Sequence, residues 1–406
     1  MNKTIVPGAL LGVIGGGEHS RMLTLTARQL GYRVAVLSPE ADCPAGAFAN
    51  LALCASLDDV DAVADLARNV AAVIVEVENL PAEAAEAAAR CAPLRPGPRV
   101  MRVVQHRGLQ KRYLRQRGFP VVPSVEIGSL RMLCEALQGF KTPAVLKATQ
   151  AGCGGRRPFL IRSPLQAEEA WAAIGRRPSV LEKWIDIHRA LTVVVAHSPS
   201  GEMVSYGPIQ NIYHRGLLDA SASPADLPRG MTDRAVQLAR DIACRLDVIG
   251  VLCVEMFLTD DYELLVNQLV PRPHDSGHLT LNAHATSQFE QLVRAICGLP
   301  LGPVDQLRPA ATVGLRGDLW RDGEPDWAKA FEVPGTHLHL YGKRNPQPGR
   351  RMGHITALAR EPRTALARAV TAREALRPVP IVGLRAARLL SGGAPEGEEV
   401  GPATAV

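Results

Sequence analysis

The sequence predicts an α/β protein whose first part is built on a parallel sheet. Short apolar runs alternate with amphipathic helical segments through the first ninety residues, in the order strand, helix, strand, helix, strand. Strands that are separated by helices pair in parallel, with right-handed crossovers. The Pro-rich segment CAPLRPGP that follows predicts a domain boundary, so we expect an N-terminal domain over residues 1–98.

The elements of this domain follow from apolar periodicity and from stop signals such as Gly31. The predicted segments, in order, are a strand at 9–14, a helix at 21–31, a strand at 33–37, a helix at 57–69, a strand at 71–79 and a helix at 81–90.

The second region, residues 99–305, combines helices with apolar strands around a glycine-rich loop at 151–155. Its predicted segments are a helix at 102–117, strands at 143–147 and 180–185, a hairpin of 191–198 with 204–211, a helix at 231–247, strands at 250–258 and 262–267 and a helix at 286–298. Thr259-Asp260-Asp261 between the last two strands is a hairpin signal.

The rest of the chain is punctuated by proline and glycine. Short apolar runs at 311–317, 336–343 and 353–359 predict a small β-rich C-terminal domain over 306–390. The segment 391–406 has few large apolar residues, so we expect a disordered tail there.

Composition excludes several classes of function. No stretch approaches the roughly 18 apolar residues of a membrane span, which favours a cytoplasmic protein without membrane partners. The net charge of +6 comes with only 4% aromatic residues and with scattered arginines, which disfavours nucleic acid as a partner and favours small anions such as phosphates. The eight cysteines form no C-x-x-C pair, so we expect reduced thiols, mostly in the core.

Two glycine-rich segments could meet phosphates. Gly15, Gly16 and Gly17 stand between a strand and a helix, where free backbone N–H groups bind anions, although a plain tight turn fits equally well. Lys147 leaves a strand beside the second glycine-rich loop and could contact a nucleotide phosphate, with a solvated strand-end lysine as the alternative. Glu182 could accept from an adenine amino group, or could be a surface carboxylate.

The predicted hairpin carries a candidate metal site. Glu255 lies within an apolar strand and faces Asn267-Gln268 on the returning strand. A buried carboxylate needs a partner, and oxygen ligands of this kind suit Mg²⁺ together with nucleotide phosphates.

Two polar loops complete the candidate residues. The segment PRPHDSGH at 271–278 is stiffened by prolines and presents Arg272, His274 and Asp275, a pattern typical of a site. Its histidines could bind a metal, but no third His or Cys neighbours them in sequence. The turns LYGK and PGRRMGH bring Lys343, Arg350 and Arg351 into a basic cluster suited to a phosphate, or to solvent.

These pieces, in this order, resemble the N5-carboxyaminoimidazole ribonucleotide synthetases from about residue 10 to about residue 360. The segments that carry the resemblance are GGG-x-x-x-RML (15–23), EVEN-x-P (76–81), VEMF (254–257), VN-x-x-x-PRPH-x-SGH (266–278), TSQFEQ (286–291), LHLYGK (338–343) and PGRRMGH (348–354). The resemblance implies three domains, an ATP-grasp fold and a homodimer. It also implies that ATP phosphorylates bicarbonate to carboxyphosphate, which then carboxylates the exocyclic amine of aminoimidazole ribonucleotide.

The resemblance also assigns roles to residues. Arg107 and Lys147 would contact ATP phosphates, Glu182 would lie on the adenine side, and Lys183 to Ile185 would form the hinge. Arg272 and Lys147 would act near the reacting centre. The remaining implied positions are Asn267 for ATP, Glu255 and Gln268 for Mg²⁺, and Gly16, Gly17, Glu78, His274, Lys343, Arg350 and Arg351 for the ribonucleotide and bicarbonate.

The sequence departs from the family pattern at several of these positions. Family Gln-Leu-Gly is Glu18-His19-Ser20 here, the aspartate of the glycine-rich loop is Gly154, and the ribose-side acidic segment is Ile187-His188-Arg189-Ala190. The second magnesium glutamate is Gln268 and the Asn of Pro-His-Asn-Ser is Asp275. The alternatives are therefore a paralogue with a different ATP-dependent ligation, including formyl transfer to glycinamide ribonucleotide, and a non-catalytic nucleotide-binding homologue.

Overall fold

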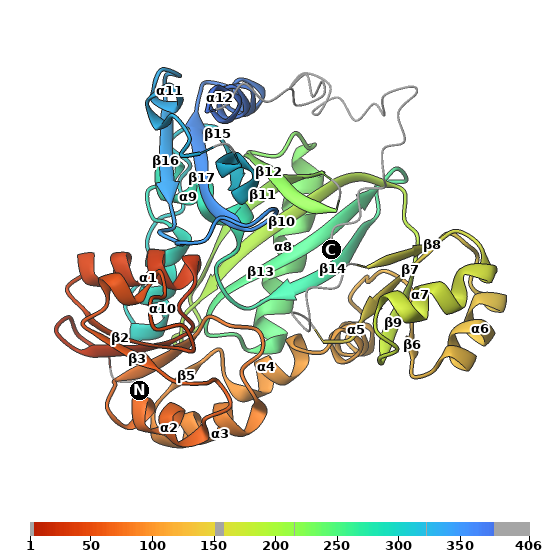
Figure 1. Cartoon of the computed structure of the whole chain (residues 1–406), viewed down its shortest axis with the longest axis horizontal. Coiled ribbons are helices and arrows are strands. Elements are labelled where there is room, and N and C mark those ends of the chain that lie inside the picture. The colour runs from red at the N-terminus through yellow and green to blue at the C-terminus, as the bar shows by residue number, and fades with distance from the viewer. Residues whose placement is uncertain (1–3, 151–157, 215, 322, 377–406) are drawn as a thin grey trace.

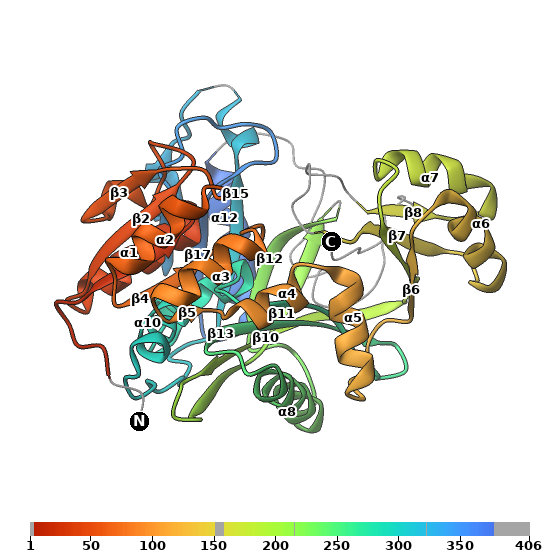
Figure 2. The ribbon, with the colours of Figure 1, turned by 90° about the horizontal axis from the view of Figure 1, so that it is seen from below.

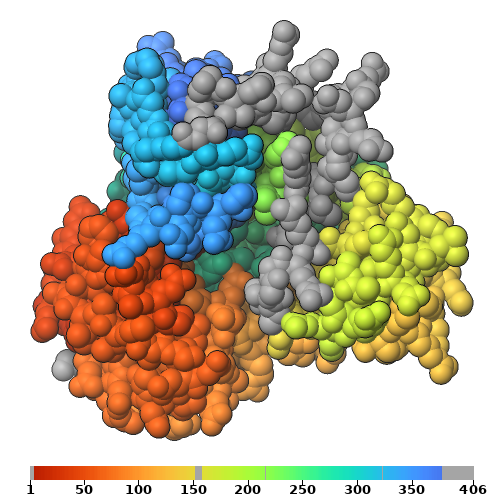
Figure 3. Space-filling model, viewed as in Figure 1, coloured from red at the N-terminus to blue at the C-terminus, as the bar shows by residue number. Residues whose placement is uncertain are grey.

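The computed structural model describes residues 4–150, 158–214, 216–321 and 323–376. A large central sheet separates an N-terminal domain and a C-terminal region on one side from a small lobe on the other (Figures 1 and 2). In the space-filling view the N-terminal (red to orange) and C-terminal (blue) surfaces touch, while the small lobe (yellow) stands at the right (Figure 3). The glycine-rich loop predicted at 151–155 and the tail at 391–406 lie outside the described residues.

The N-terminal domain is the predicted parallel sheet, with strand order β3-β2-β1-β4-β5. Its elements are β1 (Leu10–Ile14), α1 (Glu18–Gln29), β2 (Arg33–Ser38), β3 (Leu51–Cys54), α2 (Val60–Arg68), β4 (Ala72–Val75), α3 (Ala82–Cys91) and β5 (Leu94–Arg95), with a 3-10 turn at Gly46–Phe48. Strands β3 and β5 were not predicted, because β3 is mostly exposed and β5 has only two residues. β4 ends earlier than predicted, and this frees Glu76–Asn79 from the sheet.

The helix predicted at 102–117 is two helices, α4 (Pro98–Val104) and α5 (Arg107–Gln116). The break falls at His106, whose imidazole Nδ1 accepts from the backbone N–H of Leu109 and so caps α5. Arg107 is thereby placed at the first position of α5.

The small lobe is a four-stranded antiparallel sheet in the order β6-β9-β7-β8. Only β7 and β9 were predicted. The lobe consists of β6 (Ser124–Ile127), α6 (Leu130–Gly139), β7 (Ala144–Ala148), β8 (Phe159–Ile161), a 3-10 turn (Pro164–Gln166), α7 (Ala167–Ala173) and β9 (Ser179–Lys183). Helices α6 and α7 pack on this sheet through Leu133, Leu137 and Trp171.

The central sheet has eight strands in the order β14-β13-β10-β11-β12-β15-β17-β16. The stretch of chain that forms its first five strands, together with the helices that follow them, consists of β10 (Ile187–His197), β11 (Met203–His214), β12 (Leu217–Ser223), α8 (Arg229–Leu246), β13 (Gly250–Thr259), β14 (Leu264–Val270), η4 (Asp275–Leu279), α9 (Thr280–Ala283) and α10 (Gln288–Cys297). Both predicted hairpins are confirmed, since β10 pairs with β11 and β13 with β14 in antiparallel register.

The apolar runs in β10 and β13 are explained by helices on both faces of this sheet. Val193 and Val195 of β10 belong to a core shared with α8, whereas Val194 and Ala196 belong to a core shared with Phe289 of α10. A strand buried on both faces loses the alternation of apolar and polar residues. In such a strand Glu255 is a costly residue unless it has a partner.

The C-terminal strands extend the same sheet instead of forming one of their own, because β15 pairs with β12. This part contains β15 (Ala310–Arg316), a 3-10 turn (Gly317–Trp320), α11 (Trp327–Phe331), β16 (Thr336–Leu340), β17 (Arg351–Leu358) and α12 (Pro362–Ala375). Helix α12 was not predicted.

Seven cysteines fall in the described ranges, and all are free thiols. Cys43, Cys253 and Cys297 are buried, but Cys54, Cys91, Cys134 and Cys244 are exposed, so the expectation that the thiols lie mostly in the core is wrong for the described residues. None of the helices of the described residues is both long and apolar enough to span a membrane.

Candidate active site between the domains

The glycine loop between β1 and α1 presents the N-terminus of α1 to the interior of the molecule. Gly15 has φ +117°, and a Cβ on Gly16 would lie 2.6 Å from Ser38 Oγ and from Cys43 Sγ, so both positions require glycine. Gly17 is the N-cap of α1, and no side chain among the described residues caps the helix. Backbone donors of this kind favour an anion.

The basic C-terminal turn reaches this loop. Lys343 Nζ lies 2.7 Å from Glu18 Oε2 at the start of α1. Burial would raise the pKa of the Glu18 carboxyl, but His19 and Lys343 lower it to about 2. Arg351 forms an ion pair with Asp275, whereas Arg350 donates to the carbonyl oxygen of Asn345 at 3.0 Å and stays within its own turn.

The chain segment after β4 brings two carboxyl groups to Arg272. The Arg272 guanidinium donates to Glu78 Oε1 at 2.5 Å and lies 3.4 Å from His19 Nδ1. Burial raises the pKa of Glu76 to about 8, although Ser20 Oγ donates to its carboxylate at 3.2 Å. Glu76 and His19 were not among the predicted site residues, and only their positions at a strand end and a helix start could have indicated them.

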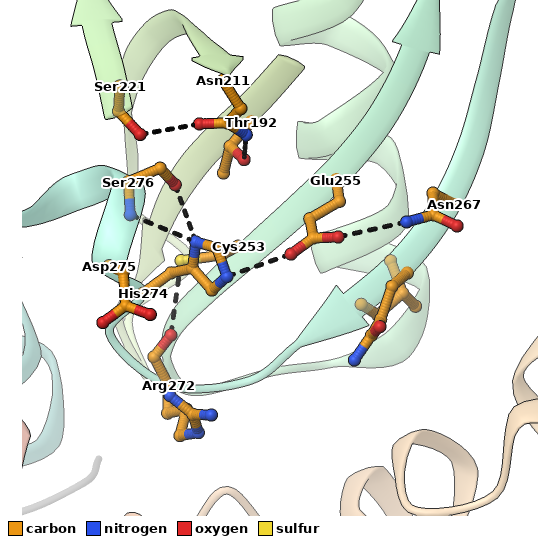
Figure 4. A network of polar contacts seen from close by, with 12 residues as sticks. Thr192, Asn211, Ser221, Cys253, Glu255, Asn267, Arg272, His274, Asp275 and Ser276 are labelled. Atoms are coloured by element: carbon orange, nitrogen blue, oxygen red, sulfur yellow. Dashed lines mark hydrogen bonds and ion pairs between the residues drawn. The ribbon is translucent and has the colours of Figure 1, made fainter. Parts of the chain in front are cut away.

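The β13–β14 hairpin holds the next part of the site (Figure 4). Glu255 Oε1 lies 3.0 Å from His274 Nε2, and Glu255 Oε2 accepts from Asn267 Nδ2 at 3.1 Å. Burial opposes ionisation of Glu255, but the His274 and Asn267 contacts and Arg107 together lower its pKa. The Glu255 carboxylate is therefore charged in an otherwise apolar strand.

Gln268 pairs with Glu255 in the backbone register of the hairpin, as predicted. Its amide oxygen accepts from Arg107 at 3.2 Å. The two side chains that were predicted to hold Mg²⁺ thus have different protein partners.

Lys147 joins the hairpin to the small lobe. Its ammonium donates to Asn267 Oδ1 at 3.5 Å and lies 3.0 Å from Glu182 Oε2. The other Glu182 oxygen lies 3.2 Å from Lys111 Nζ, and all three charged groups are buried. Burial would raise the pKa of Glu182, but Lys111 and Lys147 lower it to about 2, while burial and Lys147 lower the pKa of Lys111 to about 8.

This arrangement makes Glu182 an anchor for two lysines, one of which, Lys111, was not predicted. Lys183 is exposed at the end of β9, and Ile185 packs in a small apolar cluster with Val122. Among the described residues, no side-chain hydrogen bond or ion pair connects Lys183 or Ile185 to the other predicted site residues.

The contacts form one network across three regions of the chain. Lys147 leads through Asn267 and Glu255 to His274 in the loop that also presents Arg272 and Asp275. Asp275 leads to Arg351 of the C-terminal turn. The sites that were predicted separately for a nucleotide, for a divalent cation and for an anionic substrate are therefore adjacent.

The donor set of the hairpin fits a divalent cation. Each Glu255 oxygen accepts one contact from the protein, and an ionised carboxylate offers about four lone-pair positions. The amide oxygen of Gln268 is a neutral second ligand. Arg107 beside it adds a positive charge, which suits phosphate oxygens more than a metal ion.

Comparisons with known proteins agree with this architecture. Family models described as ribonucleotide synthetase preATP-grasp domain, ATP-grasp domain and phosphoribosylaminoimidazole carboxylase C-terminal domain match residues 9–105, 112–289 and 313–368. The N5-carboxyaminoimidazole ribonucleotide synthase of Bacillus subtilis (strain 168) is 39% identical over 88% of this chain and 93% of that protein. The one of Brucella melitensis is 36% identical over 90% of this chain and 100% of that protein.

Solved structures lead to the same family. An N5-carboxyaminoimidazole ribonucleotide synthetase in complex with ADP superposes with a TM-score of 0.87, 34% identity and coverage of 92% of this chain and 98% of the other. The Aspergillus clavatus synthase in complex with ADP and 5-aminoimidazole ribonucleotide gives a TM-score of 0.84, 28% identity and coverage of 92% and 99%. This chain has the ATP-grasp fold and belongs to the N5-carboxyaminoimidazole ribonucleotide synthase family.

Proposed function

We propose that this protein uses ATP and bicarbonate to carboxylate the exocyclic amine of aminoimidazole ribonucleotide. The observation that carries the proposal is the network that runs from Lys147 through Asn267 and Glu255 to His274, together with the ion pair that the next residue, Asp275, forms with Arg351. Phosphoryl transfer from ATP to bicarbonate, followed by attack of the amine on carboxyphosphate, requires the nucleotide and ribonucleotide sites to adjoin.

The nucleotide end of the site comprises Lys147, Arg107 and Asn267, with the backbone of Lys183–Ile185 as the hinge for the base. The ion pair with Glu182 fixes the position of the Lys147 ammonium group. Glu255 and Gln268 are the proposed Mg²⁺ ligands, and the ion would neutralise phosphate charge as the γ-phosphoryl group is transferred. Lys147 and Arg107 add fixed positive charge beside that group.

The ribonucleotide end comprises the N-terminus of α1 at Gly16 and Gly17, together with Lys343 and Arg351. These groups supply backbone and charged donors for a 5′-phosphate. Arg272, fixed by Glu78, and His274, fixed by Glu255, lie between the two ends and would orient bicarbonate. The proposal includes a homodimer and a cytoplasmic location.

One observation favours a second candidate, a nucleotide-binding homologue without ligase activity. The segment that replaces the ribose-side acids is engaged with other carboxylates, His188 with Asp260 at 3.4 Å and Arg189 with Asp226 at 4.0 Å. Two basic residues thus occupy the place of acids that would accept from a ribose hydroxyl.

The deciding experiment measures ADP release by wild type and Glu255→Gln. We expect release that depends on both bicarbonate and aminoimidazole ribonucleotide, and a loss of roughly 100-fold or more in the variant, because it removes the anionic ligand of the hairpin. Glu263→Gln is the matched control, since Glu263 is exposed at the tip of the same hairpin. ATP binding without any bicarbonate-dependent turnover in wild type would favour the second candidate, and full turnover in Glu255→Gln would refute the magnesium assignment.

A further inference from the structure

Three metal-ligating side chains converge where α1 meets η4, away from the β13–β14 hairpin. His19 comes from the first turn of α1, and Asp275 and His278 come from η4. Asp275 Oδ1 lies 3.3 Å from His19 Nε2 and 3.3 Å from His278 Nε2. The three donor atoms all lie within 4.8 Å of one another.

These donor atoms are buried and unsatisfied. His19 Nε2, Asp275 Oδ1 and His278 Nε2 each make no hydrogen bond of acceptable geometry with any described residue, although they face one another. His278 is only 1% exposed. The only described neighbours of these atoms at ion-pair distance are one another. A buried polar atom without a hydrogen bond costs roughly 1–3 kcal/mol, and a cation bound among the three would remove that cost.

The separations fit a small transition-metal ion. Ligands of a tetrahedral zinc at about 2.0–2.1 Å lie roughly 3.3 Å apart, which is the spacing found on both sides of Asp275. Imidazole nitrogens select zinc and its neighbours over Mg²⁺, which prefers oxygen. We propose that His19, Asp275 and His278 form a Zn²⁺ site with an open fourth position, which joins the N-terminal domain to the PRPHDSGH loop.

The surrounding groups support two of the three ligands. The other nitrogen of His19 lies 3.4 Å from Glu76 Oε1, which can accept from it, whereas that of His278 lies 3.4 Å from the side-chain amide nitrogen of Gln288, which is a donor and gives no such support. Contacts to the non-ligating nitrogen fix the orientation of a metal-bound imidazole. The second oxygen of Asp275 is held by Arg351, which leaves Oδ1 directed at the two rings.

The charge around the site only partly favours a cation. Arg351 and Arg272 bring positive charge that opposes it, although Arg272 is paired with Glu78. Glu18 is paired with Lys343, and burial raises the pKa of Glu76 to about 8, so Glu76 adds little negative charge at neutral pH. We therefore expect affinity below that of structural zinc sites with thiolate ligands.

This site goes beyond the proposed ligase function and does not depend on it. His19 stands where the family pattern has leucine, and Asp275 where it has asparagine. Two of the three ligands are therefore departures from the pattern, and His278 is the one residue shared with it. The cation proposed for ATP would bind separately, at Glu255 and Gln268.

The test uses the full chain, freed of metal by a chelator and kept without nucleotide. Zn²⁺ is titrated by calorimetry and in competition with a chromophoric chelator, and Co²⁺ by its visible absorption. We expect one Zn²⁺ per chain, and a loss in affinity for His19→Leu and Asp275→Asn beyond the roughly 10–100-fold that is typical of outer-shell changes. Both variants restore the family residue.

Two further variants separate this site from others. His214→Gln removes an exposed histidine and should leave Zn²⁺ binding unchanged. Glu255→Gln should also leave it unchanged, whereas it would weaken binding if zinc entered the ATP-side site. The proposal is overturned if wild type binds no Zn²⁺ at micromolar concentrations, if His19→Leu binds it as wild type does, or if Mg²⁺ competes at equal concentration.

Discussion

Glu182 shows how strongly one residue can control a buried cluster. Its two oxygens face Lys111 at 3.2 Å and Lys147 at 3.0 Å, and all three side chains are about 4% exposed. One carboxylate thus compensates two buried ammonium groups. The pKa of Lys111 falls to about 8 for this reason, since the shared anion does not fully offset burial and the neighbouring cation Lys147.

We expect Glu182→Gln to lower the free energy of unfolding by roughly 3–5 kcal/mol, because it leaves buried charge without a partner. Urea denaturation at pH 7 measures the change. The matched control is Glu126→Gln, which breaks an exposed pair with Arg112 at 2.6 Å and should cost about 0–1 kcal/mol. Equal effects of the two variants would mean that the lysines are solvated in the folded protein.

At the scale of an element, the β1–α1 loop depends on two adjacent glycines for different reasons. A Cβ on Gly16 would overlap Cys43 Cβ and would lie 2.6 Å from Ser38 Oγ. A Cβ on Gly17 would meet no atom within 4 Å, and the φ of Gly17 is −72°, which any residue adopts. Close packing therefore constrains the first glycine, and access of a ligand to the helix N-terminus constrains the second.

We expect Gly16→Ala to destabilise the protein by about 1–3 kcal/mol through overpacking, and to move the loop away from Ser38. Gly17→Ala should lower the free energy of unfolding by less, about 1 kcal/mol or below, since its Cβ would meet no atom within 4 Å and only the N-cap preference for glycine over alanine is lost. Thermal unfolding of both variants measures this. A greater loss in Gly17→Ala than in Gly16→Ala would contradict the packing argument.

At the scale of the whole molecule, local patterns predicted the elements but not the contacts between distant segments. The strands β1, β2 and β4 and both hairpins were predicted because long apolar runs mark them. Strand β3 (LALC) carries a short apolar run as well but was not predicted, and it is mostly exposed in the fold. His19 beside Asp275 and Lys111 beside Glu182 could not be predicted, because each contact joins separate elements and depends on how the domains pack.

The same packing buries His284 and half-buries His339, neither of which has a role in the proposed ligase site. His284 is 8% exposed and stacks edge-on against Tyr206 at 5.1 Å, and burial lowers its pKa to about 4. In the described part of the chain no carboxylate lies within ion-pair distance of it. Burial, together with His278 and His337, likewise lowers the pKa of His339 to about 4. Both rings are neutral in the folded protein at neutral pH.

These depressed pKa values make the fold sensitive to acid. Below a pH of about 6.5 histidines of the unfolded chain bind protons, whereas folded His284 and His339 do not until about pH 4. At these two positions the unfolded state therefore binds more protons between these values, and their contribution to the free energy of unfolding falls as the pH falls from about 6.5 to about 4, by roughly 1.4 kcal/mol per pH unit for each histidine.

The variant His284→Phe removes one of the two histidines that take up a proton on unfolding. Phenylalanine keeps the edge-on contact with Tyr206 and removes the unsatisfied Nδ1 of His284, so the variant should fold at pH 7. Urea denaturation at several pH values between 7 and 4.5 gives the slope of stability against pH. We expect the slope of the variant to be shallower than that of wild type by about 1.4 kcal/mol per pH unit, which corresponds to one proton. Parallel slopes would show that His284 has the same pKa in the folded and the unfolded protein, which would contradict its burial as the cause of a lowered pKa.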